Sequence, residues 1–389
     1  MFMGDMPELM ENILENLINE FYSLYSCALV NRHWCKMSIP ILWQDPFSIG
    51  QRQNELFFSR LQDLSLSVGS ISDLNIENVS ILLKILAKDT TKLSTLKLDE
   101  FYFDYESELL RALICIIKSQ EQLRRFNLVG LEFPTEFQGI ISALESQKNS
   151  LQEVIIECCE CSNEVKVLKN CKNLEILRIN DCFNEELLEA SLNTLEINKC
   201  YSICASDIVQ LLTKSGTLLQ RLKLVSTDEP ILEESLLLET IKSFCPNITY
   251  LNLSNITFST QFFELIDNLQ KLQFLTLWYI YEIEDEQKTL VIQFAKLLPL
   301  TLQYLDLRYS CLSLYTDSLL NNCYAPLKYL LINYLDNEKK AKALIEFCIR
   351  RRSLNYVGVE KCLNLNDNIK KEVERNVTLI ACERIVVNC

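Results

Sequence analysis

The hydrophobic pattern of this chain repeats along most of its length. From residue 61 onward, an apolar residue is followed by two variable positions, a second apolar residue, one variable position and a third apolar residue. The pattern begins at Leu61, Leu93, Leu123, Leu151, Leu174, Leu192, Leu219, Ile248, Leu272, Leu302, Leu327 and Leu354. Twelve related units predict an array of small, similar structural elements that stack on one another.

Each unit changes its hydrophobic period partway along. The apolar-x-apolar centre alternates like a strand with one buried face, and helical spacing follows, as in Leu109, Leu110, Leu113, Ile114 and Ile117. The mean step of about 27 residues resembles the leucine-rich repeat, whose units span about 20–29 residues. We therefore predict an α/β solenoid with parallel strands on its concave side and helices on its convex side, because neither element can bury its apolar face alone.

The cysteines follow the same repeat. Position 1 is the first apolar residue of a unit, and position 9 is then a cysteine in four units: Cys159, Cys182, Cys200 and Cys362. Leucine-rich repeats place Asn or Cys at this bend, so the resemblance implies structural thiols. A zinc site at Cys158-x-x-Cys161 is the alternative, but neither a histidine nor a second close cysteine pair completes a tetrahedral ligand set. We expect no metal.

Composition narrows the possible partners and compartments. The 389 residues carry a net charge of −14, which repels phosphate backbones, so we expect no nucleic acid partner. Neither an apolar run of about 18 residues nor a basic leader is present, so we expect neither a membrane partner nor secretion. An odd total of 17 cysteines without a secretory signal predicts reduced thiols in the cytoplasm, the nucleus or both.

The first 48 residues have a different pattern. Pro7 suits the first turn of a helix. Leu9, Ile13, Leu14 and Leu17 then form one apolar stripe. A second apolar set follows, formed by Leu24, Leu29, Val30 and Trp34. A unit of this size cannot bury so many large side chains internally. The apolar surface that remains exposed predicts that the unit docks into a groove of a partner protein. The alternative is that this unit is only a helical cap on the solenoid. We expect the solenoid itself to span residues 61–389, after a linker or first cap at residues 49–60.

Residues 6–47 resemble an F-box. The matching residues are Pro7-Glu8-Leu9, Ile13-Leu14, Leu17, Leu24, Cys27, Leu29-Val30, Asn31-Arg32 and Trp34, followed by Ile39-Pro40-Ile41-Leu42-Trp43 as in fungal-type members. The chain is thus similar to F-box proteins with C-terminal leucine-rich repeats. The resemblance implies a three-helix module that binds a Skp-family adaptor, and through it a cullin–RING ligase. The implied adaptor-binding residues are Pro7, Leu9, Ile13, Leu14, Leu17, Leu24, Leu29, Val30 and Trp34.

The last five units predict a column of aromatic rings on the concave face. Position 3 of these units is Tyr250, Phe274, Tyr304, Tyr329 and Tyr356, and positions 7 and 8 add Trp278, Arg308, Tyr279, Tyr309 and Tyr334. Adjacent strands lie about 4.8 Å apart, so the rings can contact one another in sequence. We predict that Tyr250, Phe274, Trp278, Tyr304, Arg308, Tyr329 and Tyr356 bind the protein substrate. The alternative is that the rings only stiffen the sheet.

If the column is open to solvent, serine replacements at Tyr304 and Tyr329 should abolish capture of the protein substrate and leave the stability of the fold nearly unchanged. Earlier units carry polar or charged groups at position 3, namely Asp63, Thr95, Arg125, Glu153, Thr194 and Arg221. A second hypothesis is that the outward cations of these units pair with an acidic or phosphorylated segment. They are Lys97, Arg125, Arg178, Arg221 and Lys223, interspersed with Glu153 and Glu196.

The function expected from the resemblance is substrate recognition within an SCF ubiquitin ligase, in which the target is held for ubiquitination and degradation. The alternative is a non-enzymatic scaffold that binds the adaptor outside a ligase. We expect no enzyme activity, catalytic residue or cofactor. The single histidine, His33, lies at a variable position of the F-box pattern. The sequence also contains no Gly-rich phosphate loop and no Gly-x-Ser-x-Gly motif.

Overall fold

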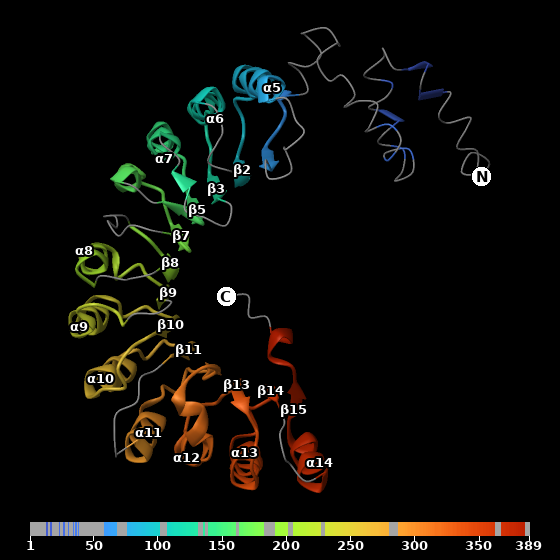
Figure 1. The fold of residues 1–389 in the computed structure, drawn as a ribbon. Coiled ribbons are helices and arrows are strands. Elements are labelled where there is room, and N and C mark those ends of the chain that lie inside the picture. The colour runs from blue at the N-terminus through green and yellow to red at the C-terminus, as the bar shows by residue number, and fades with distance from the viewer. Residues whose placement is uncertain are drawn as a thin grey trace.

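The chain forms a curved solenoid, with strands along the inside of an arc and helices along the outside (Figure 1). The computed structural model describes residues 58–67, 76–101, 107–130, 135–136, 139–160, 163–182, 191–200, 205–226, 230–279, 287–361 and 367–385, together with isolated residues between 13 and 38. The α/β solenoid expected from the repeat is therefore present in this part of the chain.

One sheet of thirteen strands lines the inside of the arc, and its described neighbours pair in parallel. The strands are β1 (Asp63–Ser67), β2 (Thr95–Phe101), β3 (Arg125–Gly130), β5 (Glu153–Glu157), β7 (Ile176–Asn180), β8 (Thr194–Cys200), β9 (Arg221–Ser226), β10 (Tyr250–Ser254), β11 (Phe274–Trp278), β12 (Tyr304–Asp306), β13 (Tyr329–Tyr334), β14 (Tyr356–Lys361) and β15 (Thr378–Ile380). Strands β4 (Thr135–Glu136) and β6 (Cys159–Glu160) form a separate pair.

Each predicted unit start lies two residues before one of the first twelve strands of this sheet. The thirteenth strand, β15, is missing from the sequence prediction. Tyr356 of β14 pairs with Thr378 of β15, which puts Asn376 at position 1 of this last unit. A polar residue at the first apolar position hides the unit from the pattern.

The helices cover the outside of the arc. They are α5 (Ile76–Asp89), α6 (Ser107–Ser119), α7 (Ile140–Ala143), α8 (Ala205–Ser215), α9 (Glu234–Phe244), α10 (Thr260–Asn268), α11 (Gln287–Leu297), α12 (Thr316–Asn322), α13 (Glu338–Arg351) and α14 (Asp367–Asn376). Short 3-10 helices are η2 (Leu144–Gln147), η3 (Asn163–Asn170), η4 (Cys311–Tyr315) and η5 (Cys382–Arg384). None of the helices described here is both long and apolar enough to cross a bilayer.

A continuous hydrophobic core separates the strands from the helices. In β2, Leu96 and Leu98 at positions 4 and 6 have no exposed surface, and equivalent residues of the other units join them in one cluster. The helices contribute their predicted apolar faces, and Leu109, Leu113 and Ile117 of α6 are buried as expected. The core therefore grows by addition of similar layers.

Two buried glutamines link successive coils, a feature that the hydrophobic pattern does not predict. The Gln120 side chain accepts a hydrogen bond from the Leu93 amide at 2.9 Å and donates to the Thr90 carbonyl at 2.6 Å. One coil later, Gln147 accepts from the Leu123 amide at 3.2 Å and donates to the Gln120 carbonyl at 2.9 Å. Each glutamine thus satisfies backbone groups where a helix turns back toward the sheet.

The thiols at position 9 also form hydrogen bonds with backbone carbonyls. The Cys159 thiol donates to the Glu157 carbonyl at 2.9 Å, and the Cys182 thiol donates to the Ile156 carbonyl of the preceding coil at 3.6 Å. Burial raises the pKa of Cys159. The side chains of Cys161, Cys200 and Cys362 lie outside the described residues, and among those described no three His, Cys, Asp or Glu side chains come together as a metal would require.

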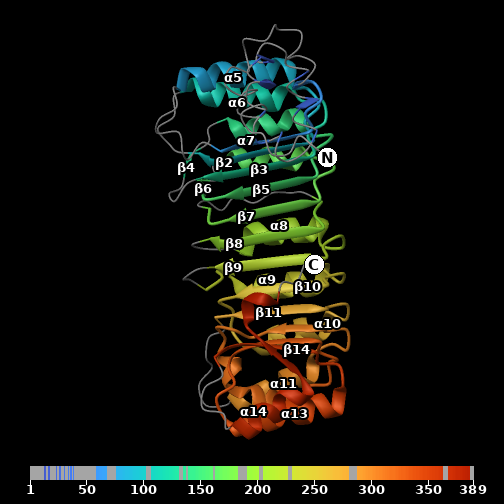
Figure 2. The same cartoon turned by 90° about the vertical axis from the view of Figure 1, so that its right-hand side faces the viewer.

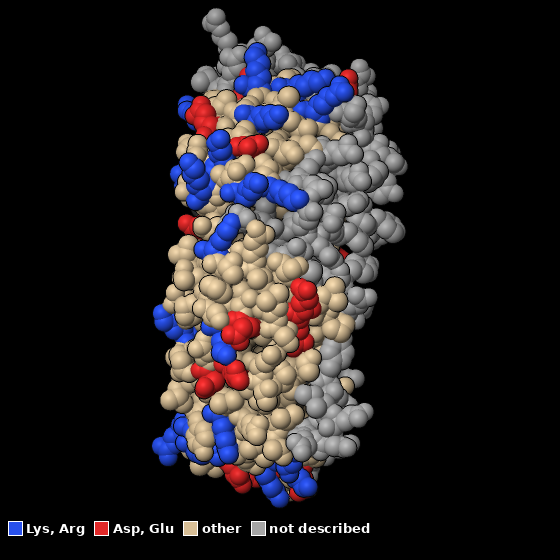
Figure 3. Space-filling view, turned by 90° about the vertical axis from the view of Figure 1, so that its left-hand side faces the viewer, with Lys and Arg blue, Asp and Glu red and all other residues tan. Residues whose placement is uncertain are grey.

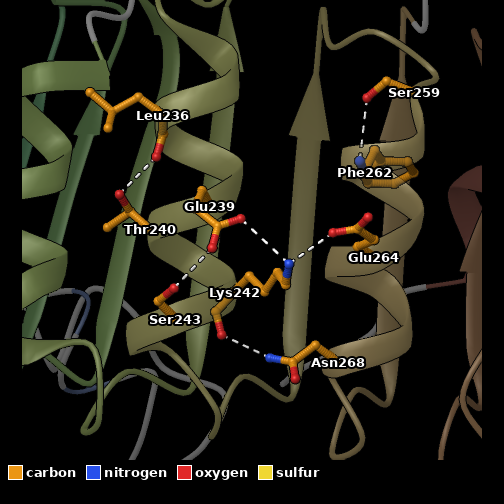
Figure 4. A network of polar contacts seen from close by, with 9 residues as sticks. All are labelled: Leu236, Glu239, Thr240, Lys242, Ser243, Ser259, Phe262, Glu264 and Asn268. Carbon is orange, nitrogen blue, oxygen red and sulfur yellow. Dashed lines mark hydrogen bonds and ion pairs between the residues drawn. The ribbon is translucent and has the colours of Figure 1, made fainter.

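Polar contacts also join neighbouring helices on the convex side. Lys242 of α9 lies 3.4 Å from the Glu239 carboxylate on its own helix and 2.8 Å from that of Glu264 on α10 (Figure 4). The Asn268 side chain at the end of α10 donates to the Lys242 carbonyl at 2.8 Å. These exposed ion pairs contribute modestly to stability and mainly fix how adjacent helices lie.

Replacement of Gln120 by leucine should destabilise the protein by about 2–4 kcal/mol, because the buried Leu93 amide and Thr90 carbonyl lose their partner. Gln147→Leu should have a similar effect. The exposed Gln152→Leu, which removes the same polar group from the surface, serves as the control. Urea unfolding followed by circular dichroism measures the difference, and equal midpoints for Gln120→Leu and Gln152→Leu would contradict the assigned role.

Candidate binding surface on the concave face

The five predicted aromatic residues do form a column. In-register pairing places Tyr250 opposite Phe274, then Tyr304, Tyr329 and Tyr356 on successive strands. Consecutive ring centroids are 6.4, 5.9, 6.3 and 5.5 Å apart. The last pair, Tyr329 and Tyr356, stacks with an interplanar angle of 11°. The structure therefore assembles one continuous surface from residues up to 106 positions apart.

The expectation that the whole column is open to solvent is wrong at its centre. Tyr304 is only 7 % exposed, because the chain after β15 turns back over the inside of the arc (Figure 2). Cys382 packs with Tyr304 and Leu331 in a small apolar cluster, and Ile385 packs against that cluster. Phe274 and Tyr329 are half-buried against the same cluster, whereas Tyr356 at the end of the column is 38 % exposed.

Arg308 was predicted to bind the substrate, but its guanidinium already has a partner. Its Nε and Nη2 atoms lie 3.1 and 2.9 Å from the two carboxylate oxygens of Asp306. Tyr304 also places its hydroxyl 3.5 Å from Asp306. Desolvation, followed by the negative charge of Asp306, raises the pKa of Tyr304, so this phenol stays neutral. The arrangement holds a partly buried charge pair beside the column.

Two well-exposed rings lie at the edge of the column. Tyr279 and Tyr309 are 50 and 47 % exposed, and their rings stack at 6.1 Å with an interplanar angle of 19°. Trp278 meets Tyr309 edge-on at 6.0 Å. Both tyrosines have a left-handed backbone, with φ of 50° and 58°, which is uncommon for bulky residues. A hydrogen bond to Glu360 raises the pKa of Tyr309.

The outward charges of the middle units pair with one another. Arg178 lies between Glu153 and Glu196, with its Nε 3.3 Å from Glu196, and Arg221 binds Glu196 from the other side. The Arg221 guanidinium also lies 3.6 Å from the centre of the Tyr250 ring, so the charged series leads directly into the aromatic column. Cations already paired in this way argue against the hypothesis that an acidic or phosphorylated segment binds to these strands.

Two further charges fit the same picture. Lys97 pairs with Asp99, and Arg125 lies 3.8 Å from Asp63. One position departs from the expected polar series, because position 3 of β7 is the apolar Ile176.

The chain as a whole has a net charge of −14, but one part of the convex side is rich in positive charge. Exposed lysines and arginines gather there toward the end that carries α5, α6 and η3 (Figure 3). They include Lys84, Lys88, Arg111, Lys118, Lys148, Lys166, Lys169 and Lys172. Averaged composition does not reveal this local excess, because acidic residues elsewhere outweigh it.

The predicted adaptor-binding residues are only partly described. Pro7, Leu9, Leu24 and Leu29 lie outside the described residues. Ile13, Leu14 and Trp34 are helical, Leu17 and Val30 lie in turns, Leu14 is fully buried and Val30 is 63 % exposed. These isolated positions leave the three-helix module and its docking face as predictions.

Comparison with known proteins yields fold-level similarities alone. No protein-family model matches the chain, and no curated protein matches it. Among solved structures, a chain of the yeast Rad7 and Elc1 complex is 14 % identical with a TM-score of 0.43, covering 95 % of this chain and 86 % of that one. A chain of the TLR13–ssRNA13 complex is 14 % identical with a TM-score of 0.42, covering 86 % of this chain and 52 % of that one.

A Bacteroides fragilis protein gives 16 % identity and a TM-score of 0.38, covering 61 % of this chain and 67 % of that one. At such low identities and TM-scores these similarities support no argument about function.

The burial of Tyr304 predicts that Tyr304→Ser lowers the free energy of unfolding by about 3–5 kcal/mol, as for other large aromatic residues in cores. Tyr356→Ser removes an exposed ring and one stacking contact, so it should cost only about 1 kcal/mol. Thermal and urea unfolding of the two variants measure both values. A Tyr304→Ser variant as stable as Tyr356→Ser would show that the returning chain does not cover the column in solution.

Proposed function

We propose that this protein is the substrate-recognition subunit of an SCF ubiquitin ligase. The observation that carries the proposal is a single chain that combines the F-box-like sequence motif of residues 6–47 with a concave column of aromatic rings. The N-terminal module binds a Skp-family adaptor, and the concave face holds a protein target. Catalysis belongs to other subunits, and this chain acts by raising the local concentration of a target lysine.

The chemistry of the column supports a protein target. Tyrosine, tryptophan and arginine dominate the energy of protein interfaces, and large rigid rings lose little conformational entropy on binding. The two stacked tyrosines at the edge, Tyr279 and Tyr309, offer aromatic surface to solvent, and Tyr356 adds a ring that is 38 % exposed. Exposed aromatic surface of this extent is typical of an interaction site.

Substitution of the F-box motif should abolish adaptor capture. We expect a full-length Pro7→Ala, Leu9→Asp variant to lose the adaptor and the cullin in affinity purification, while wild type retains both. Leu300→Asp, which changes a leucine that is 71 % exposed, is the matched control. Adaptor without cullin on the wild-type chain would favour the scaffold alternative, and wild type that captures neither protein would contradict the proposal.

Substitution of rings at the ends and the edge of the column should abolish target capture while the fold is retained. Tyr250→Ser combined with Tyr356→Ser, or Tyr309→Ser alone, should remove target proteins that wild type retains, as measured by quantitative mass spectrometry of affinity-purified complexes. Tyr324→Ser is the control, because Tyr324 is 52 % exposed but lies in the turn between α12 and β13, away from the column. Equal capture by all variants would place the target elsewhere.

A further inference from the structure

The segment after β15, residues 381–385, is hereafter the returning segment. It forms one 3-10 turn, closed by hydrogen bonds from the Arg384 amide to the Ala381 carbonyl at 3.0 Å and from the Ile385 amide to the Cys382 carbonyl at 3.1 Å. Residues three apart in a 3-10 turn lie on the same side. Cys382 and Ile385 therefore face the sheet together, whereas Glu383 and Arg384 are exposed.

The surface beneath this segment is formed by column residues and their neighbours. Cys382 is 2 % exposed and shares a buried cluster with Tyr304 and Leu331. Phe274, Tyr329 and Ile385 pack around that cluster. The returning segment thus covers the middle of the column, whereas Tyr356 at one end is exposed and Tyr250 at the other end is partly exposed.

A glycine makes this close approach possible. Gly358 occupies position 5 of β14, beside Leu331 in the sheet. A Cβ atom at Gly358 would lie 3.1 Å from the Ile385 Cδ1 atom, 3.2 Å from the Cys382 Sγ atom and 3.0 Å from the Leu331 Cγ atom. Its backbone does not require glycine, because its φ is not positive. The missing side chain therefore provides room for the returning segment.

The returning segment has the features of a bound ligand. It contributes two apolar side chains to the column, and its polar residues point to solvent. A single 3-10 turn has little stability of its own, so its conformation depends on the surface it contacts. The strand that connects it to the sheet, β15, is three residues long and pairs with β14 at the edge. A short tether of this kind permits release without disruption of the main core.

Building on the proposed function, we propose that the returning segment occupies the target's binding site as an intramolecular ligand. The target would take its place with a short turn that presents a small apolar residue and a branched aliphatic residue three positions later. Because the segment is tethered, its effective concentration at the column is high, and a target must compete with it. The affinity measured for a target is then reduced by the fraction of molecules in which the segment has left.

The first test measures release directly through the reactivity of Cys382. Burial raises the pKa of this thiol to about 11, so at pH 8 it should react slowly with iodoacetamide while the segment is in place. Gly358→Ala crowds the segment and should increase the rate of Cys382 alkylation about tenfold or more. Cys245 and Cys323 lie fully buried in the main core and report global unfolding. Peptide mass spectrometry follows all three thiols together.

Faster alkylation of Cys382 alone supports the proposal. An unchanged Cys382 rate in a folded Gly358→Ala protein would overturn it, because the segment would then tolerate crowding. If Cys245 and Cys323 also react faster, the segment is part of the global fold, and the proposal again fails. Ile385→Asp provides a second route to release, since a carboxylate is not accommodated on an apolar surface.

The second test uses a fluorescent synthetic peptide with the sequence of residues 378–389, kept reduced. It should bind full-length Ile385→Asp at least about tenfold more tightly than wild type, where the tethered segment competes. Adding Tyr329→Ser to Ile385→Asp should weaken the binding of the peptide again. Equal binding to wild type and Ile385→Asp, or no binding to either, would overturn the proposal.

Neither test involves the adaptor, cullin or ubiquitin. If the peptide binds as expected but wild type captures no adaptor, the ligase role fails and the competing segment remains. If wild type captures adaptor, cullin and target while the peptide does not bind Ile385→Asp, the ligase role remains and the competing segment fails.

Discussion

The concave surface depends on one constraint, the in-register parallel pairing of the repeated strands. Side chains alternate along each strand, so burial of positions 4 and 6 directs positions 3, 5 and 7 to the inside of the arc. Pairing of Tyr250 with Phe274 and of Phe274 with Tyr304 then carries each position from one strand to the next. A slip of one residue would exchange the leucine core for the aromatic column, so the energy that fixes the core also positions the candidate binding surface.

The inside of the arc changes character where Arg221 meets Tyr250. Before this point, outward charges alternate in sign, and each guanidinium of the series Glu153, Arg178, Glu196 and Arg221 lies against a carboxylate. Beyond it, aromatic rings replace the charges. The Arg221 guanidinium, 3.6 Å from the Tyr250 ring centre, interacts favourably with both neighbours. The paired charges already satisfy one another, whereas an aromatic ring gains from any apolar group that covers it. This difference supports the proposed target site on the C-terminal half of the arc.

The sequence predicts the strands and the column well, because a period of two and a period of 3.6 report directly which residues face inward. It does not predict what folds over the column. Periodicity predicts which side of the sheet Tyr304 faces, but the residues that cover it come about 80 positions later, after a repeat unit whose position 1 is the polar Asn376. One sequence signal relates to this cover. Gly358 interrupts a strand pattern, which often marks close approach of another backbone. A separate signal concerns the glutamines that link successive coils, because Gln120 and Gln147 are spaced by one repeat.

The two interpretations of the column, target binding and stiffening of the sheet, apply to different rings. Tyr304 is buried beneath Cys382 and bonded to Asp306, so it contributes to stability as long as the segment is in place. Tyr356 stacks on Tyr329 and is still 38 % exposed, so part of its ring is open to solvent. A surface that exchanges its own segment for a target keeps its central rings covered in both states. Such an exchange avoids the aggregation that a fully open aromatic column would promote.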